Sequence, residues 1–291
     1  MQRREKVTFG HLWGAFYPAL MYLGITVIAG IILMFIAISQ GHVTIENGNV
    51  NFGNIESDFS LMMTFFGGIM SAPLLILIKY LDVKKQRMLG AHTYKSVFFA
   101  KYLFIIPFAV SFMYACNMVV TIVEALIPSV AHSFDETAKA IYGADIGMQI
   151  ATAVIVGPIV EELIFRGLMY IRLKRMFGAG VSALVTGLMF GLFHMNISQG
   201  IYAFLFSYGA IFVYERYKNI CAPILFHIAA NAISVLVTFV YKDYNTSARS
   251  NTSSLSTSSE WAGALFVFVI SLVISGLFAL CIYKWVNPKK K

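Results

Sequence analysis

The sequence predicts an all-α, polytopic membrane protein with about eight transmembrane helices. Three observations lead to this prediction. Hydrophobic residues make up 58% of the 291 residues and charged residues only 12%, whereas an ordinary globular domain is about 25% charged. The apolar residues form long unbroken runs rather than the stripes of amphipathic helices. Lysines and arginines gather in alternate connections between those runs, as they do in membrane proteins.

Eight apolar stretches reach or approach the length of about 20 residues that a helix needs to cross a bilayer core of about 30 Å. In chain order they lie at about residues 16–39, 59–80, 102–127, 146–171, 179–195, 200–214, 222–241 and 262–285. Strands of a membrane β-barrel would instead show about 10 residues of alternating polarity, which these stretches lack. We therefore interpret residues 1–291 as a single transmembrane domain.

The connections between the spans differ in charge and composition. The loop at about 40–58 is polar and acidic, and the loop at about 242–260 is rich in serine, threonine and asparagine. The segment at about 81–98 is basic, and we expect an interfacial helix there. The first span follows basic residues, as a signal peptide does, but its apolar run is longer than a signal core. We expect it to be an uncleaved anchor.

The net charge of +8 follows from the topology. If the eight spans alternate, 19 of the 22 lysines and arginines fall on one side of the membrane, and only Lys139, Lys242 and Arg249 fall on the other. The positive-inside rule then places both termini in the cytoplasm. The positive charge indicates contact with membrane lipids and no binding of nucleic acid.

The fourth span carries two adjacent carboxylates and an arginine, which are costly in a membrane and are functional candidates by default. Pro158 precedes them, removes a backbone hydrogen bond and is expected to bend the helix. Glu162 and Arg166 are four residues apart on one face, so they can pair. Glu161 is rotated by about 100° and lacks that partner. A snorkelling cluster is the simpler alternative, but Glu161 lies about 16 Å of helix from the basic boundary at Arg172.

Two histidines lie in the spans that follow the glutamate pair. His194 ends the fifth span on the same face as Phe190, and His227 lies in the seventh span one turn before Asn231. Each histidine alone is better explained as a buried side chain bonded to a neighbouring helix. Together they lie about 20–24 Å and about 12 Å from the cytoplasmic boundary, depths similar to that of Glu161. The catalytic helices at residues 146–241 are therefore expected to meet around a water-filled cavity.

A carboxylate and imidazoles around water in a low-dielectric cavity suit hydrolysis. Glu161 can serve as a general base, an imidazole can orient the water, and Asn231 with a histidine can donate to a developing oxyanion. Glu161, His194 and His227 would also suit a zinc ion with one open position. Because there is no H-E-x-x-H motif, the spacing does not require zinc, and both Zn²⁺ and no cofactor fit the sequence.

Three short motifs resemble those of the CPBP family, which comprises CAAX endopeptidases and bacteriocin-processing or bacteriocin-immunity (Abi) proteins. The motifs are E-E-x-x-x-R at Glu161–Arg166, F-x-x-x-H at Phe190–His194 and H-x-x-x-N/B at His227–Asn231. They occur in the family's order, each on an apolar helix. The resemblance covers about residues 150–235, and the other spans match only as generic membrane helices.

The resemblance implies an intramembrane endopeptidase that hydrolyses a membrane-associated peptide or protein in a conical active-site cavity opening within the membrane. By position, Glu161 is the base that activates water and His194 assists it. The oxyanion pair is His227 and Asn231, and the supporting pair is Glu162 and Arg166. The family is often described as metalloproteases, yet a metal-free, glutamate-dependent mechanism has also been argued for it. The short loops favour the bacterial branch, which implies the bacterial cytoplasmic membrane.

Two other functions stay open at this point. A non-catalytic bacteriocin immunity protein would keep the same fold without needing Glu161. A transporter or channel would use the buried glutamate and histidines as a proton relay. The sequence shows no internal repeat of the kind that many transporters carry, which counts against the transporter.

Overall fold

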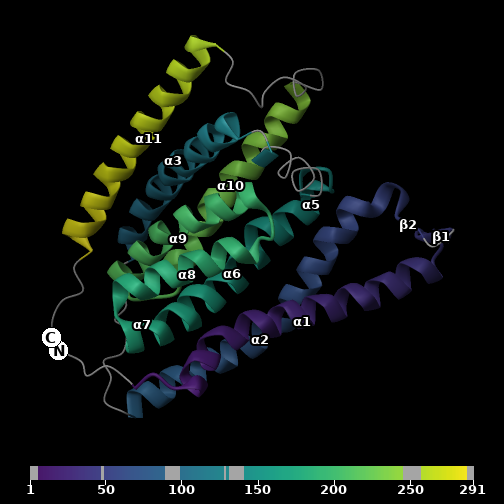
Figure 1. The fold of residues 1–291 in the computed structure, drawn as a ribbon, viewed down its shortest axis with the longest axis horizontal. Helices are drawn as coiled ribbons and strands as arrows, with labels where there is room; N and C mark the ends of the chain where they lie inside the picture. Colours follow the sequence, from purple (N-terminus) through teal and green to yellow (C-terminus); the bar gives the residue numbers. More distant parts are fainter. Residues whose placement is uncertain are drawn as a thin grey trace.

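The computed structural model describes residues 6–46, 49–88, 99–127, 129–130, 141–244 and 257–286. These residues are almost entirely helical (Figure 1), so the predicted all-α membrane fold is confirmed. Within the described ranges, seven helical runs are long and apolar enough to cross a membrane, and one further apolar helix at 179–193 is shorter. Each predicted span corresponds to one of these eight, and the chain is an integral membrane protein.

The first two spans form a long antiparallel pair of helices. α1 (Phe9–Ser39) begins after Thr8, whose side chain caps the helix by accepting a hydrogen bond from the backbone N–H of His11. α2 (Glu56–Met88) continues well past the predicted end of its span. Residues 81–88 are therefore part of this long helix and not a separate interfacial helix, and residues 89–98 lie outside the described residues.

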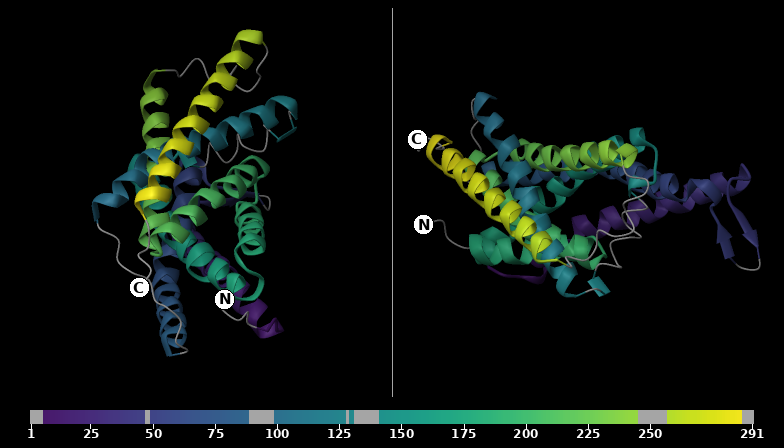
Figure 2. Two further views of the ribbon diagram at one scale, coloured as in Figure 1. Left: turned by 90° about the vertical axis from the view of Figure 1, so that its left-hand side faces the viewer. Right: turned by 90° about the horizontal axis from the view of Figure 1, so that it is seen from above.

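A short β-hairpin occupies part of the predicted polar loop at 40–58. β1 (Thr44–Glu46) pairs antiparallel with β2 (Asn49–Asn51), and Ile45 lies opposite Val50. A single 3₁₀ turn, η1 (Gly53–Ile55), leads into α2. The strands have three residues each, too few for an alternating pattern to be recognised in the sequence. Figures 1 and 2 show α1, α2 and this hairpin extending as an arm beyond the other helices.

The third and last spans pack against each other. A 3₁₀ segment, η2 (Phe99–Phe104), leads into α3 (Ile105–Leu126), and α11 (Ser258–Trp285) lies along α3 at the outside of the molecule (Figure 1). The hydroxyl of Ser275 donates to that of Ser111 at 3.0 Å between the two helices. In lipid the hydrophobic effect does not drive helices together, so hydrogen bonds between small polar side chains help to hold them in contact.

The fourth span is a continuous helical rod made of five segments. They are α5 (Ile146–Gln149), η3 (Ile150–Val156), α6 (Gly157–Glu162), η4 (Leu163–Tyr170) and α7 (Ile171–Phe177). η3 and η4 are π-helical, so the short α6 that carries the two glutamates has a π-helical turn on each side. Such turns are rare and occur often at functional sites.

Three further helices complete the bundle: α8 (Ala179–Phe193), α9 (Ile197–Tyr217) and α10 (Cys221–Tyr244). Gly178, with φ of +83°, makes the tight connection between α7 and α8, a conformation that favours glycine. α8 and α9 cross closely, because a Cβ on Gly191 would lie only 2.7 Å from the carbonyl oxygen of Gly200.

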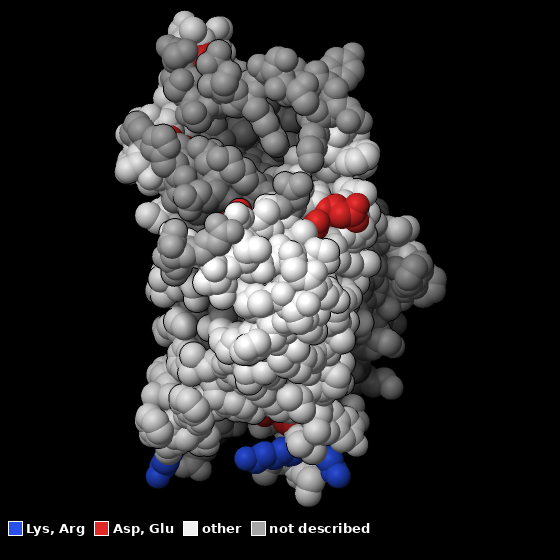
Figure 3. Space-filling view, turned by 90° about the vertical axis from the view of Figure 1, so that its right-hand side faces the viewer, with Lys and Arg blue, Asp and Glu red and all other residues white. Residues whose placement is uncertain are grey.

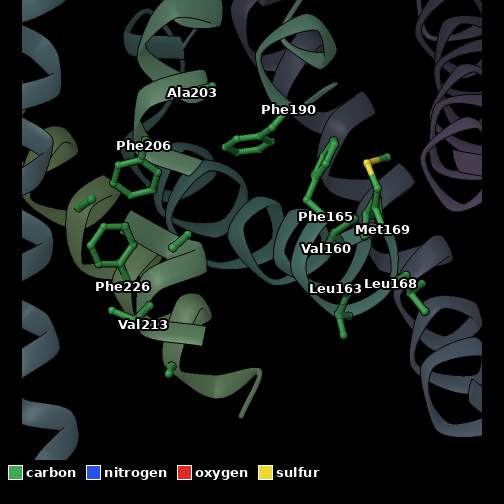
Figure 4. Packing of buried hydrophobic residues seen from close by; sticks show 14 of the residues in the cluster. Val160, Leu163, Phe165, Leu168, Met169, Phe190, Ala203, Phe206, Val213 and Phe226 are labelled. Carbon is green, nitrogen blue, oxygen red and sulfur yellow. The ribbon is translucent and has the colours of Figure 1, made fainter. Parts of the chain in front are cut away.

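A buried aromatic core holds the helices around the fourth span in place (Figure 4). Phe165 of η4 packs on Phe190 of α8 with ring centroids 4.8 Å apart. Phe206 of α9 stacks on Phe226 of α10 at 4.6 Å. Phe190 also lies 6.1 Å from the ring of His227 in α10. Aromatic packing of defined geometry therefore links the three motif-bearing helices.

The distribution of charge on the surface agrees with a membrane protein. Figure 3 shows a face on which uncharged side chains separate lysines and arginines at one end from acidic residues towards the other. Many large apolar side chains of α1 and α11 are exposed on the outside of the bundle, including Phe35 and Phe266. Their exposure is expected for helices that face lipid.

Candidate active site

Glu162 and Arg166 form the buried ion pair that their spacing predicts. Nη1 of Arg166 donates to Oε1 of Glu162 at 2.8 Å, and both side chains are 0% exposed. The guanidinium of Arg166 also lies 4.5 Å from the centroid of the Phe190 ring. Both contacts help to offset the loss of water around the buried guanidinium.

His227 of α10 lies between the two glutamates of α6. Its Nδ1 is 3.0 Å from Oε1 of Glu162, and its Nε2 is 3.9 Å from Oε2 of Glu161. Because an ionised carboxylate only accepts hydrogen bonds, the Nδ1 position carries the proton when Glu162 is ionised. Glu162 thus fixes the orientation of the His227 ring and turns Nε2 towards Glu161.

Glu161 has different surroundings from Glu162. Its side chain is 20% exposed, against 0% for Glu162, and no salt bridge joins it to a lysine or arginine among the residues that the structure describes. The separation of 3.9 Å from His227 is too long for a hydrogen bond but suits a shared water molecule. Glu161 is therefore partly exposed and has the imidazole of His227 beside it.

The side chain of Asn231 hydrogen-bonds the backbone of η3, at a carbonyl group just before Pro158. The N–H of Gly157 donates to Thr152 O, five residues earlier, which is the π-helical pattern. In that pattern the carbonyl of Ala153 would accept from residue 158, but Pro158 has no N–H. Nδ2 of Asn231 donates to Ala153 O at 2.8 Å instead. The predicted bend at Pro158 thus takes the form of a π-helical turn, and α10 supplies the missing donor.

His194 directly follows α8, as the C-cap of that helix. Its Nδ1 donates to the carbonyl oxygen of Phe190 at 2.8 Å, and its ring is 4.9 Å from the Phe190 ring. Nε2 of the neutral ring is then an acceptor. No salt bridge between His194 and either glutamate is present in the described part of the chain, so His227, and not His194, is the imidazole beside Glu161.

The metal-binding set of Glu161, His194 and His227 does not come together as three ligands. Among the described residues, no group of three or more His, Cys, Asp or Glu side chains is placed to hold a metal ion. A catalytic zinc site needs about three protein ligands at about 2.0–2.3 Å. The arrangement does not fit such a site, and we derive no step through a metal.

Comparison with known proteins agrees with the motifs. Residues 144–233, which contain all three, match the family described as "Type II CAAX prenyl endopeptidase Rce1-like". The predicted resemblance to CAAX-type membrane endopeptidases is confirmed. The "Putative membrane peptidase YdiL" of Bacillus subtilis (strain 168) is 29% identical over 90 residues, which are 31% of this chain and 37% of that protein. The match therefore spans little more than a third of that relative. No solved structure matches the chain.

The structure also adds residues to the candidate site that the sequence did not single out for a role. Phe190 contacts Arg166, His194 and His227 through its ring. Lys79 of α2 donates to the carbonyl oxygen of Gly167 in η4 at 2.6 Å. Only the motif position pointed to Phe190, and a lysine at the basic end of a span gives no sign that it supports a neighbouring helix.

Proposed function

We propose that this chain is an intramembrane endopeptidase that hydrolyses a peptide bond of a membrane-associated peptide or protein. The observation that carries the proposal is the placement of His227 between a buried, arginine-paired Glu162 and a partly exposed Glu161. The match of residues 144–233 to a family of prenyl endopeptidases supports the same chemistry.

The nucleophile in this proposal is a water molecule that hydrogen-bonds both Oε2 of Glu161 and Nε2 of His227. Glu161 accepts a proton from the water as its oxygen attacks the carbonyl carbon of the scissile bond. Glu162 and Arg166 do not touch the reacting atoms. Their role is to hold the His227 ring, in the way that a carboxylate orients the imidazole of other hydrolases.

The negative charge on the tetrahedral intermediate needs hydrogen-bond donors. In this proposal His227 enters the reaction already protonated at both ring nitrogens and keeps both protons throughout. Its Nε2–H donates first to the oxygen of the water and then to the oxyanion. The Asn231 amide has a second N–H besides the one that bonds Ala153 O. Collapse of the intermediate breaks the C–N bond, and the proton held by Glu161 passes to the leaving nitrogen.

The experiment that tests this proposal compares wild type and Glu161→Gln in reconstituted membranes. The substrates are a farnesylated peptide ending in a CAAX sequence and its unprenylated counterpart, with cleavage followed by mass spectrometry. Glutamine keeps the shape of the side chain but cannot accept the proton. Cleavage should therefore fall by about 10²–10⁴-fold, while the melting temperature stays close to wild type because a neutral amide is easier to bury than a carboxylate.

The same variant separates the proposal from its competitors. A non-catalytic immunity protein would protect cells equally well with Glu161→Gln, and wild type would cleave neither peptide. Elemental analysis of the purified wild type addresses the mechanism. A stoichiometric metal that is lost in His194→Ala and His227→Ala would contradict the metal-free arrangement proposed above.

A further inference from the structure

A cavity lies about 15 Å along the fourth span from the glutamates, where three helix ends meet. Its volume is about 470 Å³, and it is formed by the start of α1, the end of α2 and the end of α7. Figure 1 shows these three helix ends together at one end of the molecule. The volume falls in the range of about 300–1,000 Å³ that is typical of small-molecule sites.

The lining of this cavity is strongly basic. Lys6, Lys85, Arg172 and Arg175 line it, and among the residues that the structure describes Asp82 is the one acidic side chain in the lining. Four cations against one carboxylate leave a formal excess of three positive charges, with His11 counted as neutral. An excess of charge in a partly buried place favours binding of an anion.

The floor of the cavity consists of largely buried charged side chains that pair with one another. Arg172 and Asp82 are 13% and 12% exposed, and Arg175 is 20% exposed. Asp82 is shared between both arginines, with Nε of Arg172 at 3.6 Å and Nη2 of Arg175 at 3.2 Å from its Oδ1. Arg172 also donates to the carbonyl oxygen of Gly14 and lies 5.7 Å from the Tyr17 ring centroid. These contacts fix the guanidinium groups in place.

The rim of the cavity consists of exposed lysines. Lys6 and Lys85 are exposed, and neither forms a salt bridge with any residue in the described ranges. A fixed arginine floor with flexible lysines above it suits a phosphate group, because arginine binds phosphate with defined geometry and lysine adds a mobile point charge. Basic pockets between transmembrane helices at the membrane surface bind anionic lipid headgroups.

We propose that this cavity binds a phosphate-bearing anion, supplied by the headgroup of an anionic phospholipid or by free phosphate. The occupant would tie together α1, α2 and α7. Because α7 is the last segment of the fourth span, which also carries Glu162 in α6 and Arg166 in η4, occupancy would stabilise the helix on which the candidate active site lies. The cavity is separate from that site, and the proposal does not depend on the proteolytic function.

The test uses the purified full-length chain in maltoside detergent with three probes: phosphatidylglycerol, phosphatidylcholine and inorganic phosphate at matched ionic strength. Binding is measured by the shift in melting temperature and by lipid retention in native mass spectrometry. Wild type should bind phosphatidylglycerol in preference to phosphatidylcholine. Lys85→Gln should weaken this binding by about fivefold, the effect of one lysine near an anionic surface, and Lys6→Gln with Lys85→Gln by about 25-fold.

The matched control is Lys84→Gln, which removes the neighbouring exposed lysine of α2 that does not line the cavity. It should bind phosphatidylglycerol like wild type. If inorganic phosphate protects as well as the lipid does, the phosphate group alone is the ligand. If only phosphatidylglycerol protects, the lipid is the source. Equal binding of both lipids, or equal losses in Lys84→Gln and Lys85→Gln, would overturn the proposal.

Discussion

Glu161 and Glu162 are neighbours in the sequence, but the helix turns them into different surroundings. Glu162 is completely buried against Arg166 and His227, whereas Glu161 keeps a fifth of its side chain exposed. The i, i+4 rule was enough to predict the partner of Glu162 from sequence, because both residues lie on one helix. His227 is 65 residues from Glu162 along the chain. Sequence spacing within one helix does not predict which residues of two different helices lie side by side.

Arg166→Ala should destabilise the protein. The substitution leaves the carboxylate of Glu162 buried without its ion-pair partner, and breaking a buried pair in this way costs about 3–5 kcal/mol. The melting temperature in detergent should fall clearly, and the yield of folded protein should fall with it. Glu161→Gln is the control, since it keeps both members of the pair and should melt near wild type. An Arg166→Ala variant as stable as wild type would show that the pair contributes little.

The fourth span contains a helix irregularity that the sequence predicts only in part. Pro158 predicts a disturbance in the helix, because it lacks an N–H. The form of the disturbance does not follow from the proline alone. The π-helical pattern leaves Ala153 O without a backbone donor, and the amide of Asn231 on α10 completes it. Asn231 therefore has a structural role beside the catalytic role that its motif implies, and only the packing of α10 against η3 reveals it.

A double-mutant cycle between Pro158 and Asn231 tests this coupling. Asn231→Ala alone should cost about 1–3 kcal/mol of unfolding free energy, because a carbonyl in the interior loses its donor. Pro158→Ala supplies a backbone N–H at the position from which a π-helix would bond Ala153 O. In the Pro158→Ala background the loss from Asn231→Ala should therefore be smaller, with a coupling energy of about 0.5–3 kcal/mol. Reversible unfolding in mixed micelles measures all four variants.

The control for this cycle is Ser275→Ala, which removes a hydroxyl that bonds Ser111 between α11 and α3. That pair shares no contact with Pro158, so its effect should add to that of Pro158→Ala. If the loss from Asn231→Ala is the same with and without the proline, the Asn231 amide does not compensate for Pro158.

At the scale of the whole molecule, composition was enough to predict the class of fold, and apolar runs were enough to place the helices. The sequence did not predict the paired strands β1 and β2, which are too short to show a pattern. It also did not predict the extension of α2 to Met88, where the charged residues end the apolar run but not the helix. The conical cavity opening within the membrane stays a prediction. The cavity at the basic helix ends depends on where α1 begins and where α2 and α7 end, which local periodicity does not reveal.

The number of membrane crossings determines on which side of the membrane the two chain ends lie. The start of α1 and the end of α11 lie near the same end of the molecule (Figure 1), so the chain should cross the bilayer an even number of times. Seven long helical runs are present in the described residues, so α8 must count as a crossing. Its 15 residues are about 22 Å long, short of a bilayer core of about 30 Å.

Reporter fusions test this count directly. With both termini in the cytoplasm, as the 19-to-3 division of basic residues predicts, fusions after residues 50 and 250 should read as external. Fusions after residues 90 and 291 should read as cytoplasmic. A fusion in the connection after His194 decides the role of α8, because it should be external if α8 crosses the membrane. A cytoplasmic reading there, together with an external C-terminus, would mean seven crossings and an α8 that enters and leaves on one side.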